Sequence, residues 1–392
     1  MSMLFKKNLS FPSLDLILAI GFLLAVSYAA FSPWRSIFIQ GFVQNRSLVG
    51  VISTFFSLFL VPFYLIMARL ILKFGKVKTL IVASLLMLVT AIIIGFWSFL
   101  FVFLLGHSFY LLGRSFAFFV LELLIKKYSL ENEIHFIQGK VSAIVNFGWF
   151  LGPILGGFLV SSFKISGILW FMAACAILVL ILVLRGVAIF DPLASAPPIR
   201  TESFFADFKE FATRSDFLFY YCIALGLNMV YGLTSTFLPL LLWELGASNK
   251  LIGIGFALSV LPFVILEPIL GRLADKIGRE RQLFSLGFLI MAVSLILTGF
   301  SQNTHFLIIL LVLSSVGASF IEAIDQSLFM KKANHHKTSM IGIFSTAGAL
   351  GFAIALLLCA ILLIFVNLSA VFVILGFLLL IFCLISLRSL SS

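Results

Sequence analysis

Twelve apolar runs, each long enough to cross a membrane, take up most of this 392-residue chain. A membrane-spanning helix needs about 20 consecutive, predominantly apolar residues. Hydrophobic residues make up 62% of the chain and charged residues only 10%, whereas a soluble protein carries about 25% charged residues. We therefore predict an all-α integral membrane protein with transmembrane helices at approximately 14–39, 47–71, 78–97, 99–126, 139–162, 166–188, 216–243, 250–271, 282–300, 304–330, 339–363 and 367–388.

The net charge of +11 is divided unevenly between the two sides of the predicted membrane. If the N-terminus is cytoplasmic, most of the 26 lysines and arginines fall in the inner segments. This is the positive-inside rule, and it predicts that both termini are cytoplasmic in a multi-pass protein of the cell (inner or plasma) membrane. Because membrane topology accounts for the placement of the cations, the charge argues against nucleic-acid binding.

A short charged segment at 271–281 separates two predicted helices and is partly repeated earlier in the chain. It reads Gly-Arg-Leu-Ala-Asp-Lys-Ile-Gly-Arg-Glu-Arg, whereas residues 68–78 read Ala-Arg-Leu-Ile-Leu-Lys-Phe-Gly-Lys-Val-Lys. The two copies match at a constant offset of 203 residues, as Gly278 and Gly75 show (278 minus 75). An offset of half the chain is the expected trace of a duplicated six-helix unit.

The charged segment also resembles a known signature. Its pattern Gly-x-Leu-x-Asp-x-x-Gly-Arg-x-Arg is similar to the loop between helices 8 and 9 of the major facilitator superfamily of transporters, which has a copy between helices 2 and 3. The resemblance implies two pseudo-symmetric six-helix bundles that alternate access to a central site. We expect an N-terminal bundle at 1–188, a cytoplasmic linker at 189–215 and a C-terminal bundle at 216–392. Residues 201–213 of the linker are either a short amphipathic helix on the membrane surface or a mobile tether.

A glycine-rich motif lies in the fifth predicted helix, where residues 148–157 read Gly-Trp-Phe-Leu-Gly-Pro-Ile-Leu-Gly-Gly. Small residues four apart share a helix face and let two helix backbones approach closely. The motif resembles the helix-5 motif of the superfamily that is best known from proton-coupled drug exporters, which implies export. The alternative is that the glycines only pack helices. The residues concerned are Gly148, Gly152, Pro153, Gly156 and Gly157.

Two charged residues fall within the fourth predicted helix, Arg114 near its centre and Glu122 two turns further on. A charge at the bilayer centre costs at least about 2.5 kcal/mol, so Arg114 must face a water-filled cavity or a partner. The segment Leu-Gly-Arg resembles the helix-4 arginine motif of the superfamily, which implies a part in proton coupling or substrate binding. The alternative is a structural arginine that binds buried carbonyl groups.

Two acids lie three residues apart in the tenth predicted helix, Glu322 and Asp325. This spacing places both carboxylates on one helix face. A buried acid that loads and releases a proton is what a proton-coupled carrier needs. The alternative for Asp325 is a surface ion pair with Lys331 or Lys332.

Polar side chains also follow one stripe of the seventh predicted helix, and others lie in the first. In the superfamily, helices 1, 4, 7 and 10 line the central cavity, so the resemblance implies that these residues contact a solute. The alternative is hydrogen bonding between helices, which serine and threonine commonly provide. The predicted cavity residues are Ser27, Tyr28, Asn228, Tyr231 and Thr234.

The charged segments are expected to form an inner latch that holds the helix ends together when the cavity opens outward. Asp275 caps a following helix, Arg279 bridges to an acid, and Glu267 lies nearby. The first copy has Leu72 in place of the aspartate, so we expect a weaker latch there. The residues of this gating loop are Gly271, Asp275, Gly278, Arg279, Glu267, Arg69 and Gly75.

These features favour a secondary active transporter of small solutes and no enzyme activity. The preferred hypothesis is proton-coupled export of small, partly apolar, drug-like compounds. The alternatives are proton-coupled import or facilitated passage of a polar or anionic metabolite, and a membrane sensor or scaffold without transport. The expected partners are a small-molecule substrate, protons and the lipid bilayer, in a monomeric protein. We expect no cofactor and no metal, because the sequence contains no metal-ligand cluster and no phosphate-binding glycine loop.

The latch generates a first prediction. Replacing Asp275 by Asn removes the charge that holds the inner helix ends, so the carrier is expected to favour its inward-facing state. The accessibility of engineered cysteines to membrane-impermeant reagents, measured from both sides, checks this. Unchanged accessibility on both sides in D275N would contradict the latch.

Overall fold

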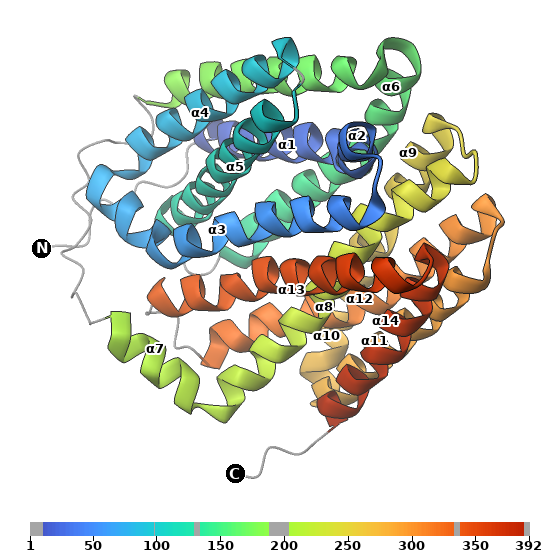
Figure 1. The fold of residues 1–392 in the computed structure, drawn as a ribbon. Coiled ribbons are helices and arrows are strands. Elements are labelled where there is room, and N and C mark those ends of the chain that lie inside the picture. Colours follow the sequence, from blue (N-terminus) through green and yellow to red (C-terminus); the bar gives the residue numbers. More distant parts are fainter. Residues whose placement is uncertain (1–10, 98, 129–133, 188–203, 333–337, 388–392) are drawn as a thin grey trace, which may run out of the picture. The chain divides into compact units, whose positions relative to one another are not determined.

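The computed structural model describes residues 11–97, 99–128, 134–187, 204–332 and 338–387, and every regular element in this part of the chain is a helix (Figure 1). Helices suit an apolar chain in a bilayer because they satisfy all backbone polar groups internally. The elements are α1 (Phe11–Phe31), α2 (Trp34–Val43), α3 (Arg46–Phe74), α4 (Lys76–Phe96), α5 (Leu100–Tyr128), α6 (Ile134–Gly186), α7 (Phe204–Thr213), α8 (Ser215–Glu244), α9 (Asn249–Leu258), α10 (Leu261–Ile277), α11 (Glu280–Phe300), α12 (Thr304–Lys332), α13 (Thr338–Phe365) and α14 (Leu368–Leu387).

The described residues contain 11 stretches that are long and apolar enough to cross a membrane. One of them, Lys140–Gly186, spans 47 residues, about twice the length of a single crossing. The helix breaks inside this stretch at Lys164, where φ is 59° and ψ is −167°. α6 therefore has two arms, at the positions of the predicted helices 139–162 and 166–188. This accords with the twelve predicted crossings.

Two other predicted helices are each divided next to a proline. The first is interrupted at Ser32 and Pro33, so that α1 ends at Phe31 and α2 begins at Trp34. The eighth is interrupted just before Pro262, between α9 and α10. Proline fixes φ and removes a backbone donor, which breaks or bends a helix.

The segment predicted as a charged loop is mostly helical, which corrects the expectation for 271–281. α10 continues past Gly271 to Ile277, and α11 begins at Glu280. The prediction ended the helix where the apolar run ends. A helix that leaves the apolar layer can continue in water, because charged residues such as lysine and arginine are good helix formers.

Two glycines end these helical extensions at matched positions of the repeat. Gly278 follows α10 with a φ of 60°, and Gly75 follows α3 with a φ of 88°. This left-handed region of φ is open to glycine at no steric cost and is the usual way to terminate a helix. The repeat at an offset of 203 residues thus places a glycine with positive φ after the helix in both copies.

The chain forms two compact units. One comprises residues 1–32 and 66–199, and the other comprises 33–65 and 200–392. The second unit therefore includes α2 and the beginning of α3 from the first half of the chain. The bundle boundaries at 188 and 216 that the repeat implied remain a prediction.

Long-range polar contacts hold α2 and the start of α3 within the second unit. The guanidinium of Arg46 donates two hydrogen bonds of 2.7 Å to the carboxylate of Glu244 at the end of α8. Arg35, which is 5% exposed, donates a bond of 3.2 Å to the hydroxyl of Thr236, also in α8. Both contacts join residues about 200 positions apart in the sequence.

In the first unit, α1 and the first arm of α6 are in close backbone contact at Gly148. A Cβ atom at this glycine would lie 2.9 Å from the Cβ of Ala25, 3.0 Å from the carbonyl oxygen of Phe22 and 3.1 Å from the nitrogen of Val26. A side chain at this position would force the two helices apart. The glycine motif of α6 therefore packs helices, as one reading of the sequence proposed.

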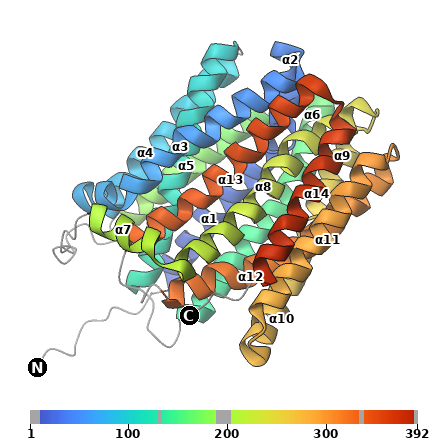
Figure 2. The ribbon, with the colours of Figure 1, turned by 60° about the horizontal axis from the view of Figure 1, so that its bottom comes forward.

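In the second unit, α8 and α13 repeat this contact at Gly351 (Figures 1 and 2). A Cβ atom there would lie 2.5 Å from the carbonyl oxygen of Leu225, 2.8 Å from the Cβ of Asn228 and 3.2 Å from the nitrogen of Met229. All four residues follow their counterparts in α1 and α6 by 203 positions, as the glycines show (351 minus 148). The two units thus use one contact in one register.

A second pair of equivalent contacts links α4 to α5 and α11 to α12. A Cβ atom at Gly113 would lie 2.8 Å from the carbonyl oxygen of Ala83 and 2.9 Å from Cγ of Met87. At Gly317 it would lie 2.6 Å from the carbonyl oxygen of Gly287 and 2.9 Å from Cγ of Met291. The offset is now 204 residues (317 minus 113). Both units are therefore built on the same internal framework.

Gly152 tests the importance of these contacts for stability. A Cβ atom there would lie 2.5 Å from the Cβ of Ala29, so we expect Gly152→Ala to destabilise the protein by about 1–3 kcal/mol through overpacking. Thermal unfolding of the purified protein checks this. Gly41→Ala in α2 is the matched control, because a Cβ there meets nothing within 4 Å. Equal melting temperatures for the two variants would contradict the packing role of Gly152.

Candidate functional site

A cation lies against aromatic rings in the first unit. Arg114 of α5 is half-buried, and its guanidinium carbon lies 4.1 Å from the ring centre of Tyr28, 4.8 Å from that of Phe118 and 5.8 Å from that of Trp149. The ring faces attract the cation, and the attraction grows when water is excluded. Tyr28 comes from α1, Phe118 from α5 and Trp149 from α6. We call these four residues the arginine site.

The other predicted residues of α1 and α5 are placed as follows. The Ser27 hydroxyl is hydrogen-bonded to the Tyr110 hydroxyl at 2.6 Å, which ties α1 to α5. Contact between helices was the alternative reading for Ser27. Glu122 is exposed, two turns beyond Arg114 on α5.

Carboxylates gather in the second unit, where three helices meet. The Tyr231 hydroxyl of α8 donates a hydrogen bond to the carboxylate of Glu322 of α12. Glu267 of α10 is close enough for its charge to act on both groups. The ring of Phe263, also in α10, contacts the ring of Tyr231 edge-on, with 6.3 Å between centres. We call Tyr231, Glu267 and Glu322 the acid site.

Glu267 also belongs to a group that the sequence did not suggest, while its part in the inner latch remains a prediction. Its distance of one turn from Gly271 placed it in the inner latch, whereas the structure brings it beside Glu322. Glu267 is half-buried, and Glu322 is exposed. Phe263 and Glu267 lie four residues apart on one face of α10, a spacing that could have indicated a shared partner on another helix.

The arginine site and the acid site occupy equivalent places in the two units. Tyr231 follows Tyr28 by 203 residues, and Glu322 follows Phe118 by 204 residues, which are the offsets of the glycine contacts (231 minus 28; 322 minus 118). In one unit the tyrosine offers its ring face to a cation, and in the other it offers its hydroxyl to an anion. The duplicated framework thus holds charges of opposite sign.

Asp325 is separated from the surface. It is 4% exposed, and its Oδ1 has no hydrogen-bond partner among the described residues. Lys332, which the sequence offered as a surface partner, instead lies 3.7 Å from Asp216. The side chain of Lys331 is outside the described residues. Burial of Asp325 removes the basis of the surface ion pair with Lys332.

The remaining polar residues of the α8 stripe bond to their own helix. Asn228 donates to the carbonyl of Ala224 at 2.8 Å, and Thr234 donates to the carbonyl of Val230 at 2.8 Å. These bonds use one of the two donors of the Asn228 amide and the one donor of the Thr234 hydroxyl, and the oxygen of each group can still accept. Their contact with a solute remains a prediction.

The motif residues of α6 are buried, whereas the described arginines of the gating loop are exposed. Pro153, Gly156 and Gly157 are buried in α6, in the arm that contacts α1. Arg69 and Arg279 are exposed near the ends of α3 and α10. The side chain of Asp275 lies outside the described residues, so the latch remains a prediction.

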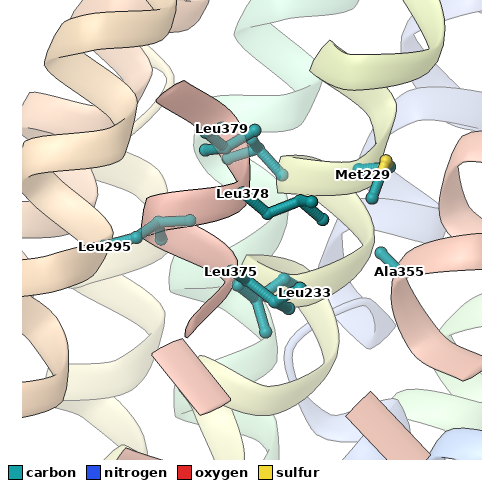
Figure 3. A pocket seen from close by; sticks show the side chains of 8 residues that line it. Met229, Leu233, Leu295, Ala355, Leu375, Leu378 and Leu379 are labelled. Carbon is teal, nitrogen blue, oxygen red and sulfur yellow. The ribbon is translucent and has the colours of Figure 1, made fainter. Parts of the chain in front are cut away.

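A small cavity lies elsewhere in the second unit, between α8, α11, α13 and α14 (Figure 3). Its volume of about 10 Å³ would hold at most one water molecule. An apolar void of this size stays dry and offers no polar group to a solute. Its lining residues are Met229, Val230, Leu233, Leu295, Ala355, Leu375, Leu378 and Leu379.

Three residues with long-range contacts were not predicted from the sequence. Trp149, which contacts Arg114, lies inside the glycine motif, whose glycines carry the recognisable pattern. Arg35 and Arg46 lie at the ends of apolar runs and bind residues about 200 positions away. The repeat carried the signal for Tyr28 and Tyr231, because both fall on the offset of 203 residues.

Comparison with known proteins agrees with this architecture. The family model described as Major Facilitator Superfamily matches residues 17–244 and 229–391. No curated protein sequence is detectably similar to the chain.

Solved structures share its fold at low identity. A POT family transporter in complex with 5-aminolevulinic acid has a TM-score of 0.76 at 14% identity, over 95% of this chain and 94% of that chain. A bacterial homologue of the human drug peptide transporters PepT1 and PepT2 has a TM-score of 0.73 at 13% identity, over 96% of this chain and 97% of that chain. The D323A mutant of the nucleoside transporter NupG has a TM-score of 0.75 at 14% identity, over 95% of this chain and 100% of that chain.

Proposed function

Because the chain belongs to the major facilitator superfamily of secondary transporters, we propose that it carries a small organic solute together with protons through the acid site. The observation that carries the proposal is the hydrogen bond from Tyr231 to Glu322, with Glu267 in electrostatic range. The proposal concerns the coupling ion, the solute and the direction of transport.

The acid site has the chemistry of a proton-binding site. Two carboxylates that are close together in a poorly hydrated environment repel each other when both are charged, and a proton on one of them removes this repulsion. Tyr231 can donate a hydrogen bond to whichever form of Glu322 is present, because a carboxyl group accepts in both states. Glu322 is exposed, and we propose that its proton exchanges with water from this face.

The arginine site supports an anionic group on the solute. The guanidinium is planar and carries its N–H donors around its edge, in a geometry that matches a carboxylate or phosphate. The guanidinium carbon lies over three aromatic rings, so an anion bound by its N–H groups would have an apolar surface next to it. We infer that the solute carries a carboxylate or a similar anion and that apolar parts of it contact the rings.

Two directions of transport have support. Uptake with protons follows from an anionic solute, because a co-transported proton offsets its charge. Export in exchange for protons, which the helix-5 motif favoured, remains the second candidate. The contact of Gly148 with α1 accounts for the small residue at this position by packing alone, so the motif adds no support for export.

Topology completes the proposal. We place both termini in the cytoplasm on the basis of the uneven distribution of lysine and arginine. We further propose that the protein acts as a monomer in the cell membrane. The end of the second unit formed by α7 and the C-terminus of α12 is then cytoplasmic.

Proton coupling is tested in liposomes that contain the purified protein and a pH-sensitive dye. An inward gradient of the transported solute should acidify the interior if solute and proton move together, and should make it alkaline if they exchange. We expect Glu322→Gln to abolish solute-evoked proton movement in either case, because an amide cannot release a proton.

Glu280→Gln is the matched control, since Glu280 begins α11 outside the acid site. It should retain the proton signal. Proton movement at the wild-type level in both Glu322→Gln and Glu267→Gln would refute the acid site as the coupling site.

A further inference from the structure

The linker helix α7 is docked on the second unit through one phenylalanine. Phe211 is 3% exposed, and its ring centre lies 5.6 Å from that of Phe217, 5.7 Å from that of Tyr221 and 5.9 Å from that of Phe329. Phe217 and Tyr221 belong to α8, and Phe329 belongs to α12. Figures 1 and 2 show α7 at the ends of α8 and α13. Of the two readings of the linker, the helix is present from Phe204 to Thr213.

The aromatic residues that receive Phe211 are themselves fixed. Phe217 and Phe329 have no exposed surface, and Phe329 stacks on Phe344 of α13 with 4.1 Å between ring centres and an angle of 11° between planes. The Tyr221 hydroxyl is hydrogen-bonded to Thr346 of α13 at 2.9 Å. The docking position for α7 is therefore formed by three packed helices.

Ion pairs tie the turn after α7 to the end of α12. Arg214, between α7 and α8, lies 2.9 Å from the Asp216 carboxylate, and Lys332 lies 3.7 Å from the same group. Arg214 also lies 3.9 Å from Glu210 of α7. These pairs are partly exposed, so each adds little stability, but together they fix how α7 enters α8.

The docked helix covers Phe329 on the face of α12 that also carries Glu322 and Asp325. Glu322, Asp325 and Phe329 are spaced by three and four residues, so they share one helix face. Glu322 is exposed, whereas Asp325 is 4% exposed and its Oδ1 has no hydrogen-bond partner in the described part of the chain. Phe329 lies between Asp325 and the end of α12 at Lys332, and Phe211 covers Phe329.

We propose that α7 is a lid that seals Asp325 from water at this end of the bundle, with Phe211 as its plug. The sealed face keeps protons on Glu322 from leaking past Asp325 to the near aqueous side, a role that rests on the proposed function. Release of Phe211 would open a second route to Asp325 and Glu322. Movement of α7 would then regulate the tightness of coupling.

Chemical labelling of the carboxyl groups tests the seal without any transport. The purified protein is treated with a water-soluble carbodiimide and glycine ethyl ester, and labelled Asp325 and Glu322 are quantified by mass spectrometry. We expect Phe211→Ala to raise the labelling rate of Asp325 about tenfold or more, because a tenfold change needs only part of the contact energy of a buried phenylalanine. Glu322, which is already exposed, should label at the same rate in all variants.

Phe208→Ala is the matched control, because Phe208 lies on the same helix and is 50% exposed. It should leave Asp325 labelling at the wild-type rate. Equal labelling of Asp325 in wild type and Phe211→Ala, or the same rise in Phe208→Ala, would overturn the proposal.

A second variant guards against misfolding. Phe211→Leu keeps an apolar side chain but loses the ring, so it should give an intermediate labelling rate in a protein with the wild-type elution volume. If Asp325 were labelled at the wild-type rate in both Phe211→Leu and Phe211→Ala, the seal would also be overturned. The seal can hold even if Glu322→Gln retains proton movement, because labelling reports access to Asp325 and not coupling.

Discussion

Backbone contact at glycine is the interaction on which both units depend. Lipid tails are as apolar as the side chains, so no hydrophobic driving force brings two membrane helices together. Helices in a bilayer therefore associate through close packing and polar contacts. Gly148 lets α6 approach α1, and Gly351 lets α13 approach α8, with a matching set of atoms around each glycine. These contacts fix the rotation of α1 and α8 and thereby direct Tyr28 and Tyr231 toward α5 and α12. The placement of the functional side chains follows from the packing.

The two units differ mainly in the charges that this framework holds. A charge inside a membrane is costly and persists where it has a partner or water. Arg114 lies against aromatic ring faces, and Glu322 accepts a hydrogen bond from a tyrosine hydroxyl. An inherited tyrosine thus serves a cation in one unit and an anion in the other. Separate sites for an anionic group and for a proton are what a coupled carrier of an anionic solute requires.

The sequence predicted the parts of the structure that repeat or that follow composition. Apolar run lengths located the crossings, and the offset of 203 residues matched Gly75 to Gly278 before their backbone was known. The sequence misplaced the end of α10, because hydropathy marks the edge of the membrane and not the end of a helix. It also grouped Glu267 only with Gly271, its neighbour in the chain, and did not predict its electrostatic contact with Glu322. Contacts such as Arg46 with Glu244 depend on how distant helices meet, and local patterns carry no signal for them.

The central claim is that the protein binds a small solute through an anionic group at Arg114. The most direct measurement is thermal unfolding of the purified protein with a panel of organic anions, zwitterions, sugars and lipophilic cations. A ligand that binds only the folded state raises the melting temperature by mass action. We expect an anionic or zwitterionic solute to stabilise the wild type but not Arg114→Ala. Arg185→Ala is the control, because Arg185 is exposed, and it should be stabilised like the wild type. Stabilisation only by lipophilic cations, or an equal shift in Arg114→Ala, would contradict the claim.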